Sequence, residues 1–303
     1  QQTNKTIEIK NPPSPEKIKT FWGNIWEKDT PTNLDTQWYR DLKRTYCTEV
    51  TSKKYVITRE LFDLYISRTP NSKAPGADKI TGYWIKKLTS LHDPLFTLLS
   101  KTQRGEIEMP DWLIRSKTIL LPKNSETDLE KNYRPIACLN TTYKLYTGIL
   151  NSFIQDHCTT NDIITVEQAG GKKGSWGCPD QLLINKMILE EVHNNRRNLF
   201  TMWFDYRKAF DSISHKWLFE ALKLAKIPDE IISNIKSLAE KWATVIHLQT
   251  QESVTVTDII TYLTGVLQGD CLSLLLFILC LNPLSHLTAT DIQSDRQEDA
   301  CQN

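Results

Sequence analysis

The chain has 303 residues, of which 40% are hydrophobic and 24% charged, which allows a sizeable core and excludes wholesale disorder. Its 37 lysines and arginines almost balance its 36 aspartates and glutamates, so a nucleic-acid groove could only come from local clustering of charge. The seven cysteines never occur as C-x-x-C, which argues against a disulfide framework and a zinc site and predicts reduced thiols in a nuclear or cytoplasmic protein.

The first third of the chain is predicted to be mainly helical. Residues 1–15 are polar and contain prolines, which indicates a linker; they show no signal peptide and no initiator methionine, so we expect a piece of a longer protein. From Glu16, apolar residues recur every three or four positions, which predicts a helix with a tryptophan-rich core face. Residues 56–68 and 83–100 are also expected to be helical, separated by a loop over 69–76.

Helices and strands are mixed over the remaining residues, which indicates an α+β fold. The expected strands are 115–122, 199–204 and a hairpin of 244–249 with 253–259. The expected helices are 142–157, 180–193, 215–226, 229–242 and 272–281. Asn282-Pro283 is expected to end the last helix, whose apolar run is well short of the ~20 residues that a membrane span needs.

A carboxylate follows the short apolar stretch 199–204. Residues 204–211 read F-D-Y-R-K-A-F-D, so Asp205 stands at the end of the expected strand. A carboxylate at that place points to the mouth of a sheet, where it can hold a hard divalent cation. For a lone aspartate, capping of a turn is the alternative interpretation.

A second motif opens the last helix. Residues 265–273 read G-V-L-Q-G-D-C-L-S. Two glycines around a glutamine allow the backbone to come close to a flat or extended ligand. The motif lies some sixty residues after the first one, so the two could meet only through the fold.

Together these motifs resemble the palm motifs of reverse transcriptases, and their residues are most similar to those of non-LTR (LINE-type) retrotransposons. Three further stretches match in the expected order: K-A-P-G-A-D (73–78), L-L-P-K (120–123) with N-Y-R-P-I (132–136), and E-Q-A-G (167–170) with D-Q (180–181). The resemblance covers roughly residues 70–285. Each motif alone is weak, but five in the right order are specific.

The resemblance implies an α+β polymerase right-hand fold and an RNA-directed DNA polymerase activity. Residues 1–69 would form a helical N-terminal extension, 70–198 the fingers, and 199–303 a partial palm with a polar C-terminal tail. The implied partners are an RNA template, a DNA primer and deoxynucleoside triphosphates, with Mg²⁺ as cofactor and no membrane.

The resemblance also implies roles for single residues at the metal. Asp205 would be the catalytic carboxylate, and the backbone carbonyl of Tyr206 would help to bind the Mg²⁺ pair. Asp211 is expected to fix the local turn rather than to bind metal. One aspartate cannot clamp two cations ~3.5–4 Å apart, so further carboxylates are needed.

At the nucleotide, Lys123 and Arg134 match the residues that hold the incoming triphosphate. Cations at that place neutralise the charge that builds up during phosphoryl transfer. Phe210 matches a steric gate against a ribose 2′-OH, while Gln268 and Gly269 would contact the nascent base pair. The alternatives are a solvated surface lysine for Lys123 and a core aromatic for Phe210.

Other basic residues could contact the phosphates of the template, because phosphate contacts position a strand without reading its sequence. Lys172, Lys173, Arg207 and Lys208 are the candidates. With Lys123 and the arginine of N-Y-R-P-I they are expected to line a basic cleft, despite the nearly neutral total charge.

The sequence departs from the family pattern in two ways. Cys271 stands where serine is usual and Leu274 where proline is usual. In addition, no Asp-Asp pair follows the second palm motif, and the residues after Leu287 are polar. We therefore expect a truncated domain that is inactive alone. The alternatives are a catalytically dead nucleic-acid-binding remnant and an unrelated α+β protein.

Overall fold

The computed structural model describes residues 7, 9, 11–172 and 174–301, and only the helical backbone of 288–301. Over these residues the fold is mixed α/β, with eleven α-helices and four strands. The strands are β1 (Ser116–Pro122), β2 (Tyr133–Cys138), β3 (Ala243–Gln249) and β4 (Val254–Thr261). The helices are α1 (Pro15–Trp26), α2 (Gln37–Thr45), α3 (Arg59–Arg68), α4 (Gly82–Lys87), α5 (His92–Gln103), α6 (Asp111–Ile114), α7 (Thr141–Thr160), α8 (Cys178–Asn194), α9 (His215–Leu224), α10 (Asp229–Ala239) and α11 (Cys271–Cys301), with short 3₁₀ turns η1 (Thr89–Leu91), η2 (Glu130–Asn132) and η3 (Ala209–Ser212).

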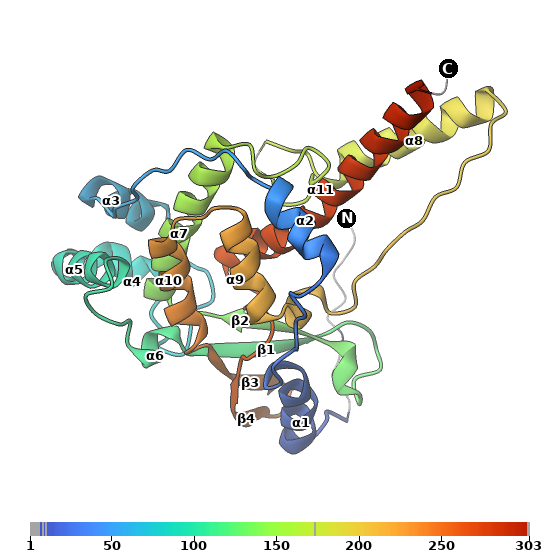
Figure 1. Cartoon of the computed structure of the whole chain (residues 1–303). Coiled ribbons are helices and arrows are strands. Elements are labelled where there is room, and N and C mark those ends of the chain that lie inside the picture. Colours follow the sequence, from blue (N-terminus) through green and yellow to red (C-terminus); the bar gives the residue numbers. More distant parts are fainter. Residues whose placement is uncertain (1–6, 8, 10, 173, 302–303) are drawn as a thin grey trace.

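The four strands form one sheet in the order β2-β1-β3-β4. β1 and β2 are antiparallel, as are β3 and β4, whereas β1 and β3 run parallel. At the parallel seam, the buried hydroxyls of Thr118 and Thr244 lie 2.7 Å apart and satisfy each other. Helices α7, α9 and α10 stand over one side of the sheet and α1 lies on the other (Figure 1). The sheet therefore joins a segment near residue 120 to one near residue 245.

Helix α1 is attached to the sheet by stacked aromatic rings. Trp22 stacks on Trp26 with 4.8 Å between the ring centroids, and Trp26 stacks on Tyr262, just after β4, at 4.5 Å. All three side chains are buried. Offset or stacked pairs of this kind add about 0.5–1.5 kcal/mol to the burial of the rings. Residues 15–26 thus belong to the central core, as the tryptophan-rich face of the sequence predicts.

Most predicted elements are confirmed, and three expectations are corrected. Helix 83–100 is divided into α4, η1 and α5, because Pro94 has no N–H to donate and its ring would clash with the carbonyl four residues before it. Helix α11 continues through Pro283 to Cys301, so the expectation that Asn282-Pro283 ends it was wrong. Helix α2 was missed altogether.

The side chain of Asn282 explains why the last helix tolerates its proline. Its amide nitrogen donates to the Tyr46 hydroxyl at 2.6 Å and to the Ile163 carbonyl at 2.7 Å, and its oxygen accepts from Thr165 N at 3.1 Å. Three tertiary hydrogen bonds therefore hold this turn of α11 in place. They offset the roughly 3 kcal/mol that an interior proline costs a helix.

The expected strand 199–204 is the third correction. Residues 199–206 run as an extended chain that pairs with no strand among the described residues. They lead back to the body from the outer end of α8, which projects away from it (Figure 1). Extended backbone becomes a strand only when a neighbouring strand accepts its N–H groups, so the apolar pattern alone was not sufficient. The order of the motifs also predicts that the strand ending at Asp205 lies beside the 244–259 hairpin or its neighbour, and this prediction is wrong, because the sheet contains only β2, β1, β3 and β4 among the described residues.

In the described part of the chain, the search for a helix that could cross a membrane finds none. The apolar run that begins α11 is instead buried within the protein: Leu272, Leu276 and Leu279 are at most 1% exposed. These side chains pack between α7 and α9.

Asp270 is a buried carboxylate at the start of α11. Thr147 Oγ1 donates to its Oδ1 at 2.8 Å, while Oδ2 has no hydrogen-bond partner among the described residues. Burial raises the pKa of Asp270 to about 6, and the bond from Thr147 opposes that shift only in part. Because the ordinary pKa is about 3.9, the folded state binds the proton more tightly than the unfolded state. The ionised form therefore costs stability above pH 6, and this cost disappears as the pH falls towards 4.

We predict that Asp270→Asn raises the free energy of unfolding at pH 7.5 by about 2 kcal/mol, since it removes a buried charge and keeps the acceptor for Thr147. The gain should shrink to nearly zero at pH 4. Urea denaturation of both proteins between pH 4 and 8 measures it. An unchanged difference over this range would show that the charge of Asp270 is not responsible.

Candidate functional site

A small pocket brings together four residues that the sequence motifs predicted for nucleotide binding. It has a volume of about 220 Å³. Its lining is Trp22, Lys123, Tyr133, Arg134, Pro135, Lys208, Ala209, Phe210, Asp211 and Gln268. Three of these side chains are cationic and one is acidic, so the pocket favours a negatively charged ligand.

The pairing of β1 with β2 places two of the cations. Leu121 pairs with Arg134 and Pro122 with Tyr133 in the antiparallel ladder. The ladder continues through Lys123 N, which donates to the Asn132 carbonyl at 2.8 Å. Lys123 and Arg134 therefore leave adjacent strands at the same end of the sheet, and both are exposed. Eleven residues separate them in the sequence, which gave no indication of this register.

The second motif reaches the same pocket because two backbones come very close. Ala137 N in β2 donates to the Gln268 carbonyl at 2.7 Å. Gly269 has φ +132°, and a Cβ at this position would lie 2.4 Å from the Ala137 carbonyl oxygen. Only glycine permits that approach, so the requirement for a glycine after Gln268 is structural. Gln268 lines the pocket while Gly269 forms the contact behind it.

Phe210 is held at the pocket by contacts on both sides. Its ring stacks on Phe277 of α11, with 4.9 Å between centroids and 17° between planes. Its carbonyl accepts a hydrogen bond from Val266 N at 2.9 Å. The ring is half-buried and lines the pocket. The ring is thus both a packed aromatic and a wall of the pocket, and the two interpretations made from the sequence are compatible.

Asp211 lines the pocket and is buried. Its Oδ1 accepts a hydrogen bond from Trp26 Nε1 at 2.9 Å. Burial raises the pKa of the carboxyl, against the effects of Trp26 and Lys208. Gly265 (φ +89°) lies against its backbone, where a Cβ would be 2.9 Å from the Asp211 carbonyl oxygen. These contacts agree with the structural role expected for Asp211.

Lys208 lies in the pocket rather than on an open surface. Its backbone is left-handed (φ +54°), and its ammonium lies 4.1 Å from the ring centroid of Phe21 and 4.2 Å from that of Trp22. Burial lowers the pKa of Lys208 to about 8; the Asp211 carboxylate opposes this shift, and Lys123 and a neighbouring arginine add to it. The sequence motifs missed the part of Trp22 and Trp26 in this site, because a tryptophan on a helix core face carries no signal for a contact 185 residues away.

The other predicted basic residues do not join the pocket. The ammonium of Lys172 donates to the carbonyls of Ile164 and Thr165, at 2.9 and 3.1 Å. Arg207 is exposed and does not line the pocket. Lys173 lies outside the described residues. The expected basic cleft therefore reduces to Lys123, Arg134 and Lys208 in the described part of the protein, and contact of Lys172, Lys173, Arg207 and Lys208 with nucleic acid stays a prediction.

The expected metal site is not assembled in the same way. Asp205 and Tyr206 lie on the exposed segment between α8 and η3, and Asp205 has no hydrogen bond or ion pair with another described residue. No group of three His, Cys, Asp or Glu side chains that could hold a metal occurs in the described part of the chain. Two-metal catalysis needs carboxylates from more than one motif. The described residues therefore do not fit a two-metal centre.

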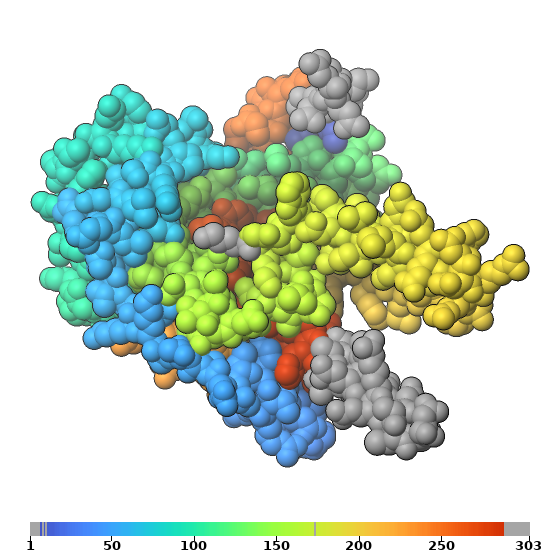
Figure 2. Space-filling model, turned by 90° about the horizontal axis from the view of Figure 1, so that it is seen from above, coloured from blue at the N-terminus to red at the C-terminus, as the bar shows by residue number. Residues whose placement is uncertain are grey.

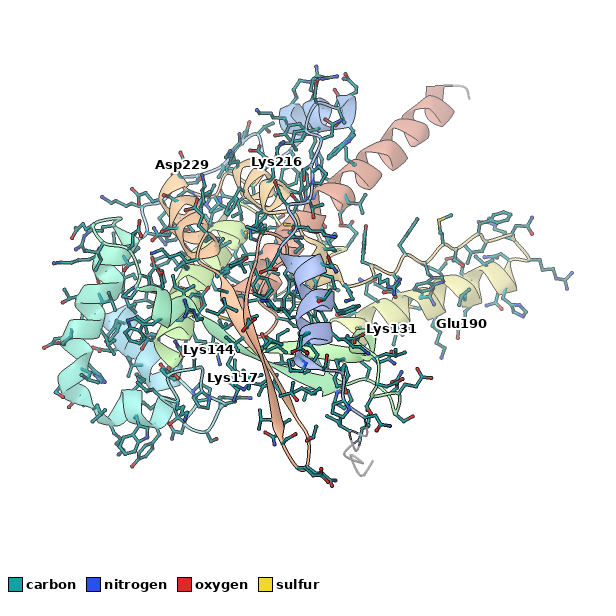
Figure 3. The ribbon with its side chains drawn as sticks, turned by 90° about the horizontal axis from the view of Figure 1, so that it is seen from below. Lys117, Lys131, Lys144, Glu190, Lys216 and Asp229 are labelled. Atoms are coloured by element: carbon teal, nitrogen blue, oxygen red, sulfur yellow. The ribbon has the colours of Figure 1, made fainter. Side chains whose placement is uncertain are left out.

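Apolar side chains accompany Asp205 on this segment and on α8. None of the residues of α8 is buried. Phe200, Met202, Trp203 and Phe204 are between 77% and 95% exposed. The space-filling view shows α8 and the neighbouring chain as a lobe that stands out from the body (Figure 2), and Glu190 lies on this lobe, away from the sheet (Figure 3). The carboxylate is thus carried by a part of the chain that has few packing partners of its own.

Comparison with known proteins gives a consistent result. The family described as "Reverse transcriptase (RNA-dependent DNA polymerase)" matches residues 121–298, more than half of the chain. The chain is 22% identical over 286 residues to the "Retrovirus-related Pol polyprotein from type-2 retrotransposable element R2DM" of Drosophila melanogaster, which covers 92% of this chain and 25% of that protein. It is 27% identical over 215 residues to the "Retrovirus-related Pol polyprotein from type-1 retrotransposable element R2" of Popillia japonica, covering 70% and 28%.

A third relative is the "Transposon TX1 uncharacterized 149 kDa protein" of Xenopus laevis. The chain is 24% identical to it over 219 residues, which is 71% of this chain and 16% of that protein. The chain thus spans between 16% and 28% of the length of these three relatives.

We predict that Trp26→Phe lowers the free energy of unfolding by about 2–4 kcal/mol, because it leaves the buried carboxylate of Asp211 without its donor. In the Asp211→Asn background the same change should cost at least ~1 kcal/mol less, because the acceptor of the Trp26 hydrogen bond is then a neutral amide and no longer a charged carboxylate. Urea denaturation measures both. Trp112→Phe, at a ring that is 61% exposed, is the matched control and should have no effect. Equal costs in the two backgrounds would contradict a Trp26–Asp211 bond.

Proposed function

Because the chain belongs to the reverse transcriptase (RNA-dependent DNA polymerase) family and is similar to Pol polyproteins of non-LTR retrotransposons, we propose that it carries the nucleotide-binding part of an RNA-directed DNA polymerase. Its substrates would be an RNA template, a DNA primer and deoxynucleoside triphosphates. The observation that supports this most directly is the pocket in which Lys123, Arg134, Phe210 and Gln268 meet.

The chemistry of the pocket fits a nucleoside triphosphate. Lys123 and Arg134 would bind phosphate oxygens, and the planar guanidinium can do so with two parallel hydrogen bonds. Phe210 would limit the room at the 2′ position of the sugar, and Gln268 with Gly269 would lie against the new base pair. At about 220 Å³ the pocket is smaller than the ~300–1,000 Å³ of a complete small-molecule site, so it would hold only part of the nucleotide.

In the right-hand description of a polymerase, residues 70–198 would be the fingers and 199–303 part of the palm, preceded by the extension 1–69. Mg²⁺ is the cofactor that we propose, with Asp205 and the carbonyl of Tyr206 among its ligands. The arrangement of the described residues does not by itself supply that centre, so the other carboxylates would have to come from outside this sequence, which contains no Asp-Asp pair.

Arg134→Ala is expected to weaken the binding of dATP to the 303-residue chain at least ~10-fold, since a charge-assisted contact to phosphate is lost. Isothermal titration calorimetry at low salt measures the dissociation constants. Arg196→Ala is the matched control, because Arg196 is exposed near the end of α8 and should leave binding unchanged. No detectable dATP binding by the unaltered chain, or equal effects of the two changes, would count against the proposed function.

Polymerase activity should require more than these 303 residues. We expect no primer extension on an RNA template with Mg²⁺ by the chain alone, and activity when it is part of a longer protein with an Asp-Asp strand and a thumb. In that longer protein Asp205→Asn should abolish extension, whereas Asp211→Asn should cost much less. A fully active Asp205→Asn protein would refute the assignment of the carboxylate. Template binding without extension by the longer protein would favour the binding remnant.

A further inference from the structure

One wall of the nucleotide pocket comes from helix α1. Trp22 of α1 and Lys208 of the first palm motif line it together, although 186 positions separate them (208 − 22). Helix α1 lies against the sheet (Figure 3) and precedes residue 121, where the match to the family begins. The contribution of α1 to the pocket is therefore a property of this fold that the family match does not assign.

The aromatic rings of α1 hold the ammonium of Lys208 in place. The distances of 4.1 and 4.2 Å from Nζ to the ring centroids of Phe21 and Trp22 are well within the ~6 Å range of cation–π contacts. Lys208 has left-handed backbone geometry (φ +54°), which lysine rarely adopts. Strained backbone that positions a single side chain is typical of binding sites.

Two donors in this pocket have no acceptor. Lys208 Nζ and Trp22 Nε1 are both buried, and neither forms a hydrogen bond with another described residue. Asp211 also lines the pocket, and its Oδ1 accepts a hydrogen bond from Trp26. Its carboxylate favours the charged form of Lys208 from a distance, without a hydrogen bond between the two side chains. Buried donors without acceptors are rare in folded proteins, because each loses its hydrogen bonds to water without replacement. A ligand with several acceptor oxygens would supply the partners that these two donors need.

We propose that Lys208 and Trp22 donate hydrogen bonds to phosphate oxygens of the incoming nucleotide, which makes α1 part of the nucleotide-binding site. This inference rests on the proposed function. It adds two phosphate ligands to Lys123 and Arg134, and it assigns to Lys208 the nucleotide rather than the template backbone.

Phosphate fits these donors better than the rest of a nucleotide does. The lining carries three cations, and Asp211 is the single carboxylate in it. A triphosphate presents several charged acceptor oxygens, whereas the acceptors of a sugar or base are neutral at neutral pH. Charge-assisted hydrogen bonds to phosphate are roughly twice as strong as neutral ones. The Phe21 and Trp22 rings favour the charged form of Lys208, which such a bond requires.

The test compares ligands that differ only in their phosphates. Calorimetry gives the affinities of dATP, dAMP and deoxyadenosine for the 303-residue chain and its variants. Lys208→Met should weaken dATP binding about 10-fold and leave deoxyadenosine binding unchanged. Trp22→Phe keeps the ring and removes Nε1–H, and it should weaken dATP binding about 3-fold, as the loss of one hydrogen bond predicts. Lys131→Met is the matched control, because Lys131 is exposed on η2 and should have no effect.

The outcomes separate this inference from the proposed function. If Arg134→Ala weakens dATP binding and Lys208→Met does not, the function stands and the role of Lys208 is overturned. A loss of dATP and deoxyadenosine binding by equal factors would show that Lys208 only shapes the pocket, which also overturns it. If Lys208→Met does not fold, NMR spectra of lysine-labelled protein replace the calorimetry. The signal that is present in the unaltered chain and absent from the Lys208→Arg variant belongs to Lys208. That signal in the unaltered chain must then move when dATP is added and not with deoxyadenosine.

Discussion

The close contact between two backbones, at Gly269 and Ala137, is the constraint on which the candidate site depends. It joins the loop before α11 to β2, so that Gln268 enters the pocket beside Arg134. The same loop is held at its other end, where Gly265 lies against the backbone of Asp211. Each contact excludes a Cβ: the first joins the loop to β2 in the first half of the chain, and the second joins it to the residue that follows Phe210. These contacts fix the position of Phe210 relative to the cations of the β1–β2 hairpin.

The pocket and the expected metal site differ in how well their surroundings hold them. The pocket is framed by a sheet, by α11 and by α1, and its side chains are fixed by stacking and by backbone hydrogen bonds. Asp205 lies on an extended segment with exposed aromatic neighbours and no strand beside it among the described residues. A binding constellation is precise when rigid elements carry it. The chain therefore presents a formed pocket with three cationic side chains, and a carboxylate at Asp205 that the described residues do not hold in place.

The tryptophans of helix α1 have two roles, one in the core and one at the pocket. Trp22 and Trp26 are fully buried core residues, as their helical spacing predicts. In addition, the Trp22 ring lines the pocket and lies beside the Lys208 ammonium, and Trp26 donates a hydrogen bond to Asp211. A side chain can have both roles because an aromatic ring presents a large apolar surface together with one polar N–H group. Helix α1 is for this reason part of the pocket and not only a connection that precedes it.

Local patterns in the sequence determined most of the helices, the two hairpin partners β3 and β4, and the family, because periodicity and short motifs depend on neighbouring residues. They also selected Lys123, Arg134, Phe210 and Gln268 as candidates. Which candidates meet was decided by tertiary structure: the register of β1 with β2, the approach of Gly269 to Ala137 and the stacking of α1 on the sheet. The apolar stretch 199–204 shows where a prediction from local sequence fails. Its composition predicts a strand, but a strand exists only with a partner for its backbone, and no local pattern specifies a partner that is distant in the chain.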